Sequence, residues 1–349
     1  MASTNGVFIS DNGEAISAFY PFVGADSAVV IDTNGNALPV DVIIGANELY
    51  DVCKFKVNGK TTPIKIASTP SNDGEKVWML GYSIKNQDAK QVPIQKTELF
   101  MDKYTYYIFS SETPENMEGC PFVNAKGELI GILQHANHSE GTHAVDAHFM
   151  KDMQINNGLS LADPVLRQTT IRTQLPAKEE DALVTLLMAS EQNKKNYLKY
   201  IQDFKRSFPH AVDGYAAQAR QYANKKEFAK AATEMETAIQ KVHKKDVAHA
   251  EYAKIIFHQQ LFQPDSTYLA WSLDKALAEA QKAYEINPLP AYLHQQAQII
   301  YSKGNYQKAY DMFLALTKTN LRSGELFYEA AQAKAQLKAN QAEILSLLD

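Results

Sequence analysis

The sequence predicts two domains of different class, an all-β domain followed by an all-α domain built from repeats. Short β-branched and aromatic runs fill residues 5–148, and turn dipeptides such as Asn34-Gly35 separate them. From residue 179 onward glycine and proline become scarce and apolar residues follow helical spacing. We therefore expect a β domain over 1–160, a linker over 161–178 and helical repeats over 179–349.

The β domain contains two successive groups of expected strands. Many short, evenly spaced strands are typical of barrels or sandwiches, and two groups in series allow two barrels. The expected strands of the first group are 7–9, 28–31, 40–44 and 52–55, and those of the second group are 77–80, 92–94, 104–109 and 129–133.

The helical region contains a pattern of small and aromatic residues that recurs in several copies. The first copy comprises Tyr215, Ala219, Tyr222, Phe228, Ala231 and Ala238, the second Ala253, Ala276, Ala280, Ala283 and Pro288, and the third Leu293, Ala297, Ile300, Gly304, Tyr306, Ala309 and Phe313. A partial fourth copy starts near Phe327 and Ala331, and residues 182–209 form a degenerate leading copy. The pattern resembles tetratricopeptide (TPR) repeats.

The TPR resemblance implies a functional surface. One helical hairpin cannot bury its apolar face alone, so the copies are expected to stack and present a concave groove. Such a groove is typical of proteins that bind an extended peptide or a protein partner. The alternative is that the helices serve only as a rigid arm that packs against the β domain.

Residues 116–131 are similar to the nucleophile loop of trypsin-like serine proteases of the HtrA (Deg) type. The register is anchored by Pro121, Asn124, Gly127 and Gly131, and it puts the nucleophilic serine's position on Glu118.

The other two positions of the catalytic triad follow from two further segments. Residues 6–32 resemble the first-barrel pattern of the same proteases, and their Gly24-Ala25-Asp26 places Tyr20 where the catalytic histidine stands. Residues 45–56 resemble the family's aspartate segment, with Asp51 at the orienting aspartate. The resemblance therefore implies a trypsin-like double β-barrel that retains one triad member of three.

Loss of the serine and the histidine removes the chemistry of serine proteolysis. Acyl transfer needs a hydroxyl nucleophile and an imidazole that takes its proton. The phenol of Tyr20 is a poor base near neutral pH, and Glu118 adds negative charge where an oxyanion has to form. We expect a non-catalytic pseudoprotease whose repeats bind a peptide or protein.

Three alternatives remain open from the sequence. The first is a peptidase with a rearranged site based on Glu118 or Cys120, the latter lying two residues past the aligned nucleophile. The second is a metal site formed by four clustered histidines, against which exposed turn histidines are the plainer interpretation. The third is a purely structural chain whose active partner lies elsewhere. The clustered histidines are His135, His138, His143 and His148.

Composition excludes several other classes of protein. The formal net charge is −5, so no basic excess indicates nucleic acid, and no apolar run approaches the roughly 18 residues of a membrane span. Only two cysteines occur, Cys53 and Cys120, which excludes a disulfide framework. We expect no cofactor, and the sequence leaves the oligomeric state open.

The resemblance also carries an expectation about location. The arrangement of both domains is similar to secreted fusions of a trypsin fold with TPR repeats in Gram-negative bacteria, which implies an extracytoplasmic location. Because the similarity starts inside the first barrel, we expect an N-terminal strand and an export signal upstream of residue 1.

Overall fold

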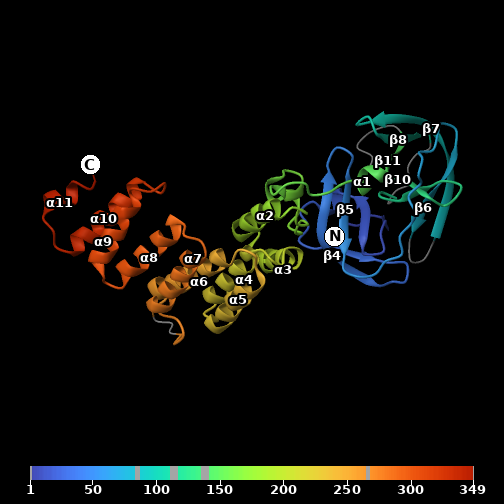
Figure 1. Ribbon diagram of the computed structural model, residues 1–349. Helices are drawn as coiled ribbons and strands as arrows, with labels where there is room; N and C mark the ends of the chain where they lie inside the picture. The colour runs from blue at the N-terminus through green and yellow to red at the C-terminus, as the bar shows by residue number, and fades with distance from the viewer. Residues whose placement is uncertain (1, 83–86, 111–116, 135–140, 265–267, 349) are drawn as a thin grey trace. The chain divides into compact units, whose positions relative to one another are not determined.

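The computed structural model describes residues 2–82, 87–110, 117–134, 141–264 and 268–348. The chain divides into two compact units, Met1–Tyr197 and Leu198–Asp349. The first unit contains all the strands of the described chain and several short helices, and the second unit is all-α (Figure 1). The expected order, a β region followed by a helical region, is therefore confirmed.

The first unit begins with an antiparallel sheet in the strand order β1-β2-β5-β4-β3. In β4, register shifts against β5 mark bulges, which bend a strand and increase its twist. The sequence predicts a first barrel without its N-terminal strand, and the described residues form this open sheet of five strands. The strands are β1 (Gly6–Phe8), β2 (Glu14–Ala18), β3 (Val29–Ile31), β4 (Ala37–Asn47) and β5 (Val52–Val57).

A closed barrel of six strands follows, in the order β10-β11-β8-β7-β6-β9. In β8, Thr105, Tyr107 and Phe109 are buried and alternate with less buried neighbours, as the pleat of a barrel strand requires. The second barrel expected from the sequence is confirmed. Its strands are β6 (Lys76–Tyr82), β7 (Gln87–Phe100), β8 (Tyr104–Phe109), β9 (Pro121–Val123), β10 (Leu129–Leu133) and β11 (Thr142–Asp146).

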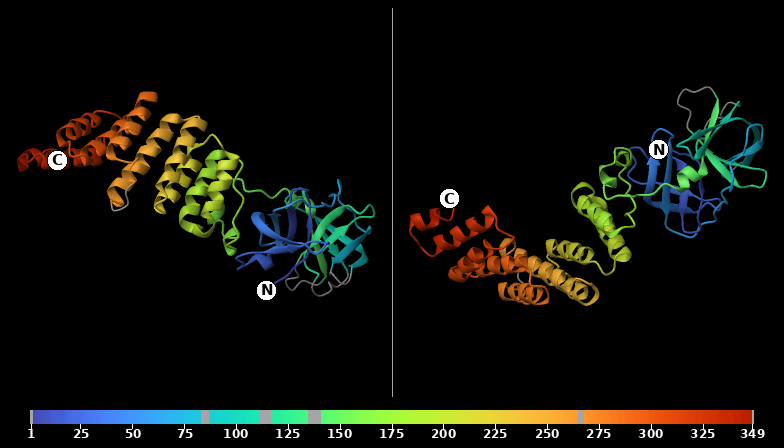
Figure 2. Two further views of the ribbon diagram at one scale, coloured as in Figure 1. Left: turned by 90° about the horizontal axis from the view of Figure 1, so that it is seen from below. Right: turned by 45° about the horizontal axis from the view of Figure 1, so that its top comes forward.

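One buried cluster joins the sheet and the barrel, which lie side by side (Figures 1 and 2). Ile16 and Val52 come from the sheet, Leu129 and Val145 come from the barrel, and all four side chains are fully buried. Phe149 joins the same cluster from the short helix α1 (Ala147–Lys151). This shared core fixes the positions of loops that meet between the two sheets.

Residues 161–178, expected to be a linker, instead pack on the first sheet. Ile43 in β4 donates its N–H to the carbonyl of Arg172 and accepts the N–H of Gln174, both at 2.9 Å. The buried guanidinium of Arg172 lies 2.8 Å from the carboxylate of Asp41. The sequence pattern missed this attachment because the segment has too few residues for strand periodicity to show.

The attached segment contains short helical turns, and helix α2 follows it within the first unit. The hydroxyl of Thr185 in α2 donates to the carbonyl of Gly158 at 3.1 Å, which ties the helix to the same unit. The division between the compact units thus lies later than the change of sequence pattern at residue 179. The helices are η1 (Tyr20–Phe22), η2 (Ser160–Ala162), η3 (Leu166–Gln168), α2 (Glu179–Gln192) and η4 (Lys194–Asn196).

The second unit consists of helices that pack against their neighbours in the chain as antiparallel pairs (Figure 2). Its helices are α3 (Tyr197–Ser207), α4 (Val212–Asn224), α5 (Phe228–Lys241), α6 (Lys245–Phe262), α7 (Leu273–Ile286), α8 (Pro290–Ser302), α9 (Tyr306–Leu316), α10 (Gly324–Gln336) and α11 (Gln341–Leu345). None of the described helices is long and apolar enough to cross a bilayer.

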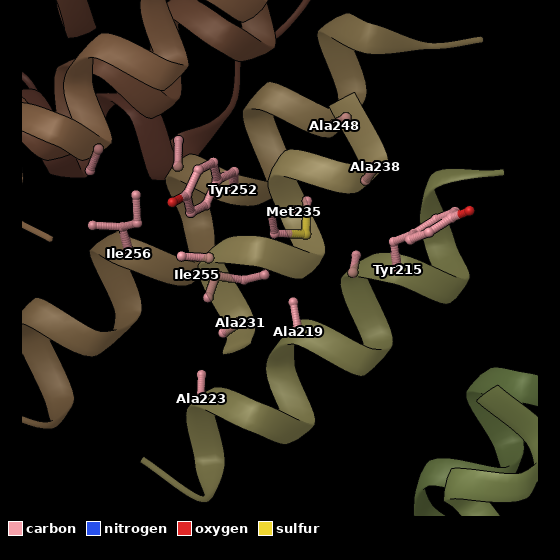
Figure 3. Close-up of a cluster of buried hydrophobic side chains, with 14 of the residues drawn as sticks. Tyr215, Ala219, Ala223, Ala231, Met235, Ala238, Ala248, Tyr252, Ile255 and Ile256 are labelled. Atoms are coloured by element: carbon pink, nitrogen blue, oxygen red, sulfur yellow. The ribbon is translucent and has the colours of Figure 1, made fainter. Parts of the chain in front are cut away.

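Alanines make close helix packing possible in this unit. Ala219, Ala231 and Ala238 are fully buried, and they lie between helices α4, α5 and α6 with Met235 and Tyr252 (Figure 3). A small side chain lets two helix backbones approach closely, so the recurring alanines of the sequence pattern are the residues at the contacts.

Candidate functional site

The three triad positions predicted from the sequence come together in the first unit. Tyr20 opens η1 just after β2, Asp51 directly precedes β5, and Glu118 lies in the turn before β9. Burial raises the pKa of the Tyr20 phenol, and the negative charges of Glu118 and then Asp51 raise it further. Both carboxylates are therefore close enough to act electrostatically on the phenol.

Asp51 holds backbone at this site. Its Oδ1 accepts the backbone N–H of Tyr20 at 2.7 Å and that of Phe19 at 3.1 Å. Asp51 itself has a φ of 47°, a left-handed conformation that aspartate tolerates better than most residues. The phenol of Tyr20 donates elsewhere, to the carbonyl of Ser3 at 3.2 Å. Asp51 thus fixes the loop that carries Tyr20, and the phenol hydrogen-bonds to Ser3.

Glu118 is fixed through its backbone. Its carbonyl oxygen accepts the N–H of Asn5 and the hydroxyl of Thr4, each at 2.9 Å. The next residue, Gly119, donates its N–H to the carbonyl of Leu133 at 3.0 Å and has a φ of 74°. This turn is therefore fastened to the N-terminal segment on one side and to the barrel on the other.

Sequence reasoning missed the contribution of Thr4 and Asn5. These residues belong to a short polar stretch without periodicity, so no pattern marks them as part of the site. The neighbouring Gly6 is the first residue of β1, and this strand carries the segment to Glu118. The pairing of β1 with β2 fixes one of the two segments, and the hydrogen bonds of Thr4 and Asn5 to Glu118 join it to the other.

The chemistry available at the site follows from these contacts. At neutral pH the raised pKa keeps Tyr20 a neutral phenol, which can donate a hydrogen bond but is a poor proton acceptor. A carboxylate side chain stands at the position aligned with the nucleophile, where a serine mechanism needs a hydroxyl. The arrangement can bind a polar group, and it has no imidazole at the aligned base position.

Cys120, the alternative nucleophile, lies in the core of the barrel. Its side chain is fully buried and belongs to a cluster with Phe109 and Phe122. The Cys120 sulfur lies 3.9 Å from the sulfur of Met117. Neither Cys120 nor Cys53 forms a disulfide, and burial raises the pKa of the Cys53 thiol. Both cysteines therefore occupy core positions, where a substrate has no direct access to the sulfur.

The histidine cluster separates into different environments. His143 in β11 stacks on the ring of Tyr106 at 5.4 Å, and burial lowers its pKa. His148 in α1 has its Nδ1 at 3.1 Å from the carboxylate of Asp146. His135 and His138 lie outside the described residues. Among the residues that are described, no group of three or more metal-ligating side chains is found.

The second unit has a polar contact between helices α8 and α10. His294 Nε2 lies 2.6 Å from one carboxylate oxygen of Glu329, and Gln298 donates to the other oxygen at 2.8 Å. The Glu329 hydrogen bond raises the pKa of His294 above its ordinary value of 6.5, which outweighs the lowering effect of burial. Glu329 therefore joins two residues of α8 to α10.

This contact predicts a pH-dependent stability. Because the folded state raises the pKa of His294, its stabilising effect is complete below about pH 6.5 and is lost as pH rises through the folded pKa. We expect His294→Gln to lower the melting temperature by about 2 °C at acidic pH and by less at alkaline pH. Thermal melts of His258→Gln, at an exposed histidine on α6, provide the control. A melting difference independent of pH would contradict the prediction.

Comparisons with known proteins find only a distant structural similarity. No protein-family model matches it, and no curated protein matches its sequence. Solved structures show a distant structural similarity to HtrA-type and other trypsin-like serine proteases over about 43% of the chain.

Three of these structures illustrate the similarity. The inactive form of the Rv3671c protease has a TM-score of 0.36 and 17% identity, and the match covers 43% of this chain and 81% of that one. A serine endoprotease from Yersinia pestis has a TM-score of 0.37 and 21% identity, and the match covers 44% of this chain and 60% of that one. The HtrA-type protease AlgW with a decapeptide has a TM-score of 0.37 and 19% identity, and the match covers 42% of this chain and 49% of that one. The match thus spans less than two thirds of the last two structures.

Proposed function

We propose that this protein is a non-catalytic pseudoprotease with a TPR-type scaffold that binds a peptide or protein partner. The observation that supports it is the convergence of Tyr20 and Glu118, the residues aligned with the catalytic base and nucleophile. Asp51 accepts the backbone N–H of Tyr20, and the charges of Glu118 and Asp51 act on the Tyr20 phenol, so the groups that meet here differ from those of a serine-protease triad.

The energetics of acyl transfer support the absence of catalysis. Hydrogen-bond donors aimed at the developing oxyanion usually make the largest catalytic contribution, and a carboxylate at the nucleophile position opposes it. Asp51 Oδ1 accepts two backbone N–H groups, and one of them comes from Tyr20, the residue at the aligned histidine position. Substrate activation by the mechanism of serine proteases is therefore not expected.

The packing of the helical unit supports a binding role. Ala219, Ala253 and Ala297, which share one position of the repeat pattern, are all fully buried. Stacked hairpins of this kind form extended concave surfaces on which peptides and partner helices bind. A net charge of −5 favours a protein or peptide over nucleic acid as the ligand.

Turnover of casein by the purified protein tests the proposal. We expect no cleavage above a blank by the wild-type protein or by Glu118→Ala, with folding of both confirmed by a cooperative thermal melt. A thiol-blocking reagent should change nothing, because Cys120 is buried. Cleavage that disappears in Glu118→Ala would contradict the proposal and establish a rearranged peptidase. Cleavage lost on thiol modification would instead assign the chemistry to cysteine.

A further inference from the structure

The outer edge of β3 is an open position in the first sheet. The neighbouring barrel closes on itself with six strands, whereas this sheet ends at β3 within the described part of the chain. An open strand edge presents main-chain N–H and C=O groups that can pair with another strand. The edge is short, and the orientation of its backbone can be derived from the pairing with β4.

Two hydrogen bonds at the ends of β3 set this orientation. The N–H of Asp32 donates to the carbonyl of Asn36 at 3.0 Å, and the N–H of Val40 donates to the carbonyl of Ala28 at 2.9 Å. In an antiparallel pair, residues that bond to the partner strand recur at every second position. Val30, midway between Ala28 and Asp32, therefore also bonds to β4.

The intervening residues, Val29 and Ile31, direct their N–H and C=O groups away from β4. Their side chains are 55% and 49% exposed, although both are β-branched and apolar. The side chain of Val30 points to the other face and packs on the buried cluster of the first sheet. Val29 and Ile31 thus combine an available main-chain edge with two exposed side chains on one face.

Acidic residues flank this edge at both ends. Asp26 lies in the bend before β3, is exposed and accepts the hydroxyl of Thr170 at 2.6 Å, and Asp32 directly follows the strand. Hydrogen bonds from the side chain and backbone of Asn36 lower the pKa of Asp32, so its carboxylate is ionised at neutral pH. A basic strand therefore complements the edge in charge.

We propose that the β3 edge binds an extended peptide in antiparallel pairing, with β-branched residues opposite Val29 and Ile31 and a basic residue opposite Asp26 and opposite Asp32. Main-chain hydrogen bonds supply affinity in this mode of recognition, and alternate side chains supply specificity. The site lies in the first unit and is independent of any groove in the helical unit.

A second copy of the chain fits the β3 edge less well than a basic peptide does, because its charges repel those at the edge. In a twofold antiparallel pairing centred on Val30, Asp32 lies opposite Ala28 and diagonal to Asp26 of the second copy. Diagonal neighbours on adjacent strands are about 7–8 Å apart, so both ends of the ribbon would carry paired like charges. A basic peptide replaces this repulsion with attraction.

Binding of a labelled peptide tests the proposal on the full chain. The probe is Thr-Arg-Val-Thr-Val-Thr-Thr-Arg, whose arginines lie opposite Asp32 and Asp26 when its valines lie opposite Ile31 and Val29. We expect saturable binding by fluorescence anisotropy, and a loss of at least about tenfold in affinity for Val29→Lys and for Ile31→Lys. Leu187→Lys, which changes a 59% exposed leucine on α2 of the same unit, should bind within about twofold of wild type.

A chemical control addresses the main chain directly. The same peptide N-methylated at both valines cannot donate to the edge, and we expect it not to bind the wild-type protein. Because this comparison uses only the wild-type protein, it tests the main-chain pairing even if a lysine variant fails to fold. Equal binding of the two peptides, or equal binding by wild type and Ile31→Lys, would overturn the proposal. A sedimenting dimer that Ile31→Lys abolishes, without peptide binding, would assign the edge to a second copy and also overturn it.

Discussion

Gly119→Ala is expected to lower the free energy of unfolding by about 3 kcal/mol, whereas Gly127→Ala lowers it by about 1 kcal/mol. The two glycines have nearly the same left-handed backbone, with φ values of 74° and 73°. A Cβ at Gly119 would lie 2.1 Å from the carbonyl oxygen of Asn5, but one at Gly127 would meet nothing within 4 Å. The backbone penalty is common to both, so the difference isolates the contact with Asn5.

Urea denaturation of the two variants measures this difference. The clash involves backbone on both sides, so it can be relieved only if the Thr4–Asn5 segment or the Glu118 turn moves. We expect such a movement to break the 2.9 Å hydrogen bond from the Asn5 N–H to the Glu118 carbonyl. Equal denaturation midpoints for both variants would show that this contact does not hold the site together.

Glu279→Ala is expected to lower the free energy of unfolding by about 3 kcal/mol at neutral pH. The Glu279 side chain is only 2% exposed, and it accepts hydrogen bonds from three donors on helices α6 and α7. His249 Nδ1 lies at 2.5 Å, Lys275 Nζ at 2.8 Å and Lys282 Nζ at 3.1 Å. Removal of the carboxylate leaves the mostly buried imidazole of His249 without this partner.

The loss should depend on pH. Burial would raise the pKa of Glu279, but hydrogen bonds from His249, Lys275 and Lys282 outweigh burial and lower the pKa to about 2. A lowered folded-state pKa means that the stabilisation is complete above the unfolded value of 4.5 and disappears as pH falls towards 2. The difference between wild type and Glu279→Ala should shrink over this range.

Matched substitutions make the Glu279 result interpretable. Glu285→Ala changes an exposed carboxylate on the same helix and should alter stability by no more than about 0.5 kcal/mol. Glu279→Gln retains the shape of the side chain but removes the charge and replaces one acceptor oxygen by a donor NH2, so it tests the charge together with that acceptor. If Glu279→Ala and Glu285→Ala have equal free energies of unfolding at every pH, the hydrogen bonds from the three donors do not stabilise the protein.

The candidate site was partly accessible from the sequence. Loop motifs placed Tyr20, Asp51 and Glu118 in one register, and the structure brings them together because each lies at a strand end between two sheets. The contacts of Thr4 and Asn5 had no sequence signal. They depend on long-range hydrogen bonds, which local patterns do not encode.

By itself, the sequence determined the order of a β region and a helical region and the alanines at which helices meet. Both follow from local properties, since the spacing of apolar side chains and the size of each side chain can be read directly from the sequence. Tertiary structure alone decided that residues 161–178 attach to β4 through Arg172, that Cys120 is buried in the barrel, and that the first sheet ends at β3. These features depend on which distant segments pair, and strand pairing is a property of the whole fold.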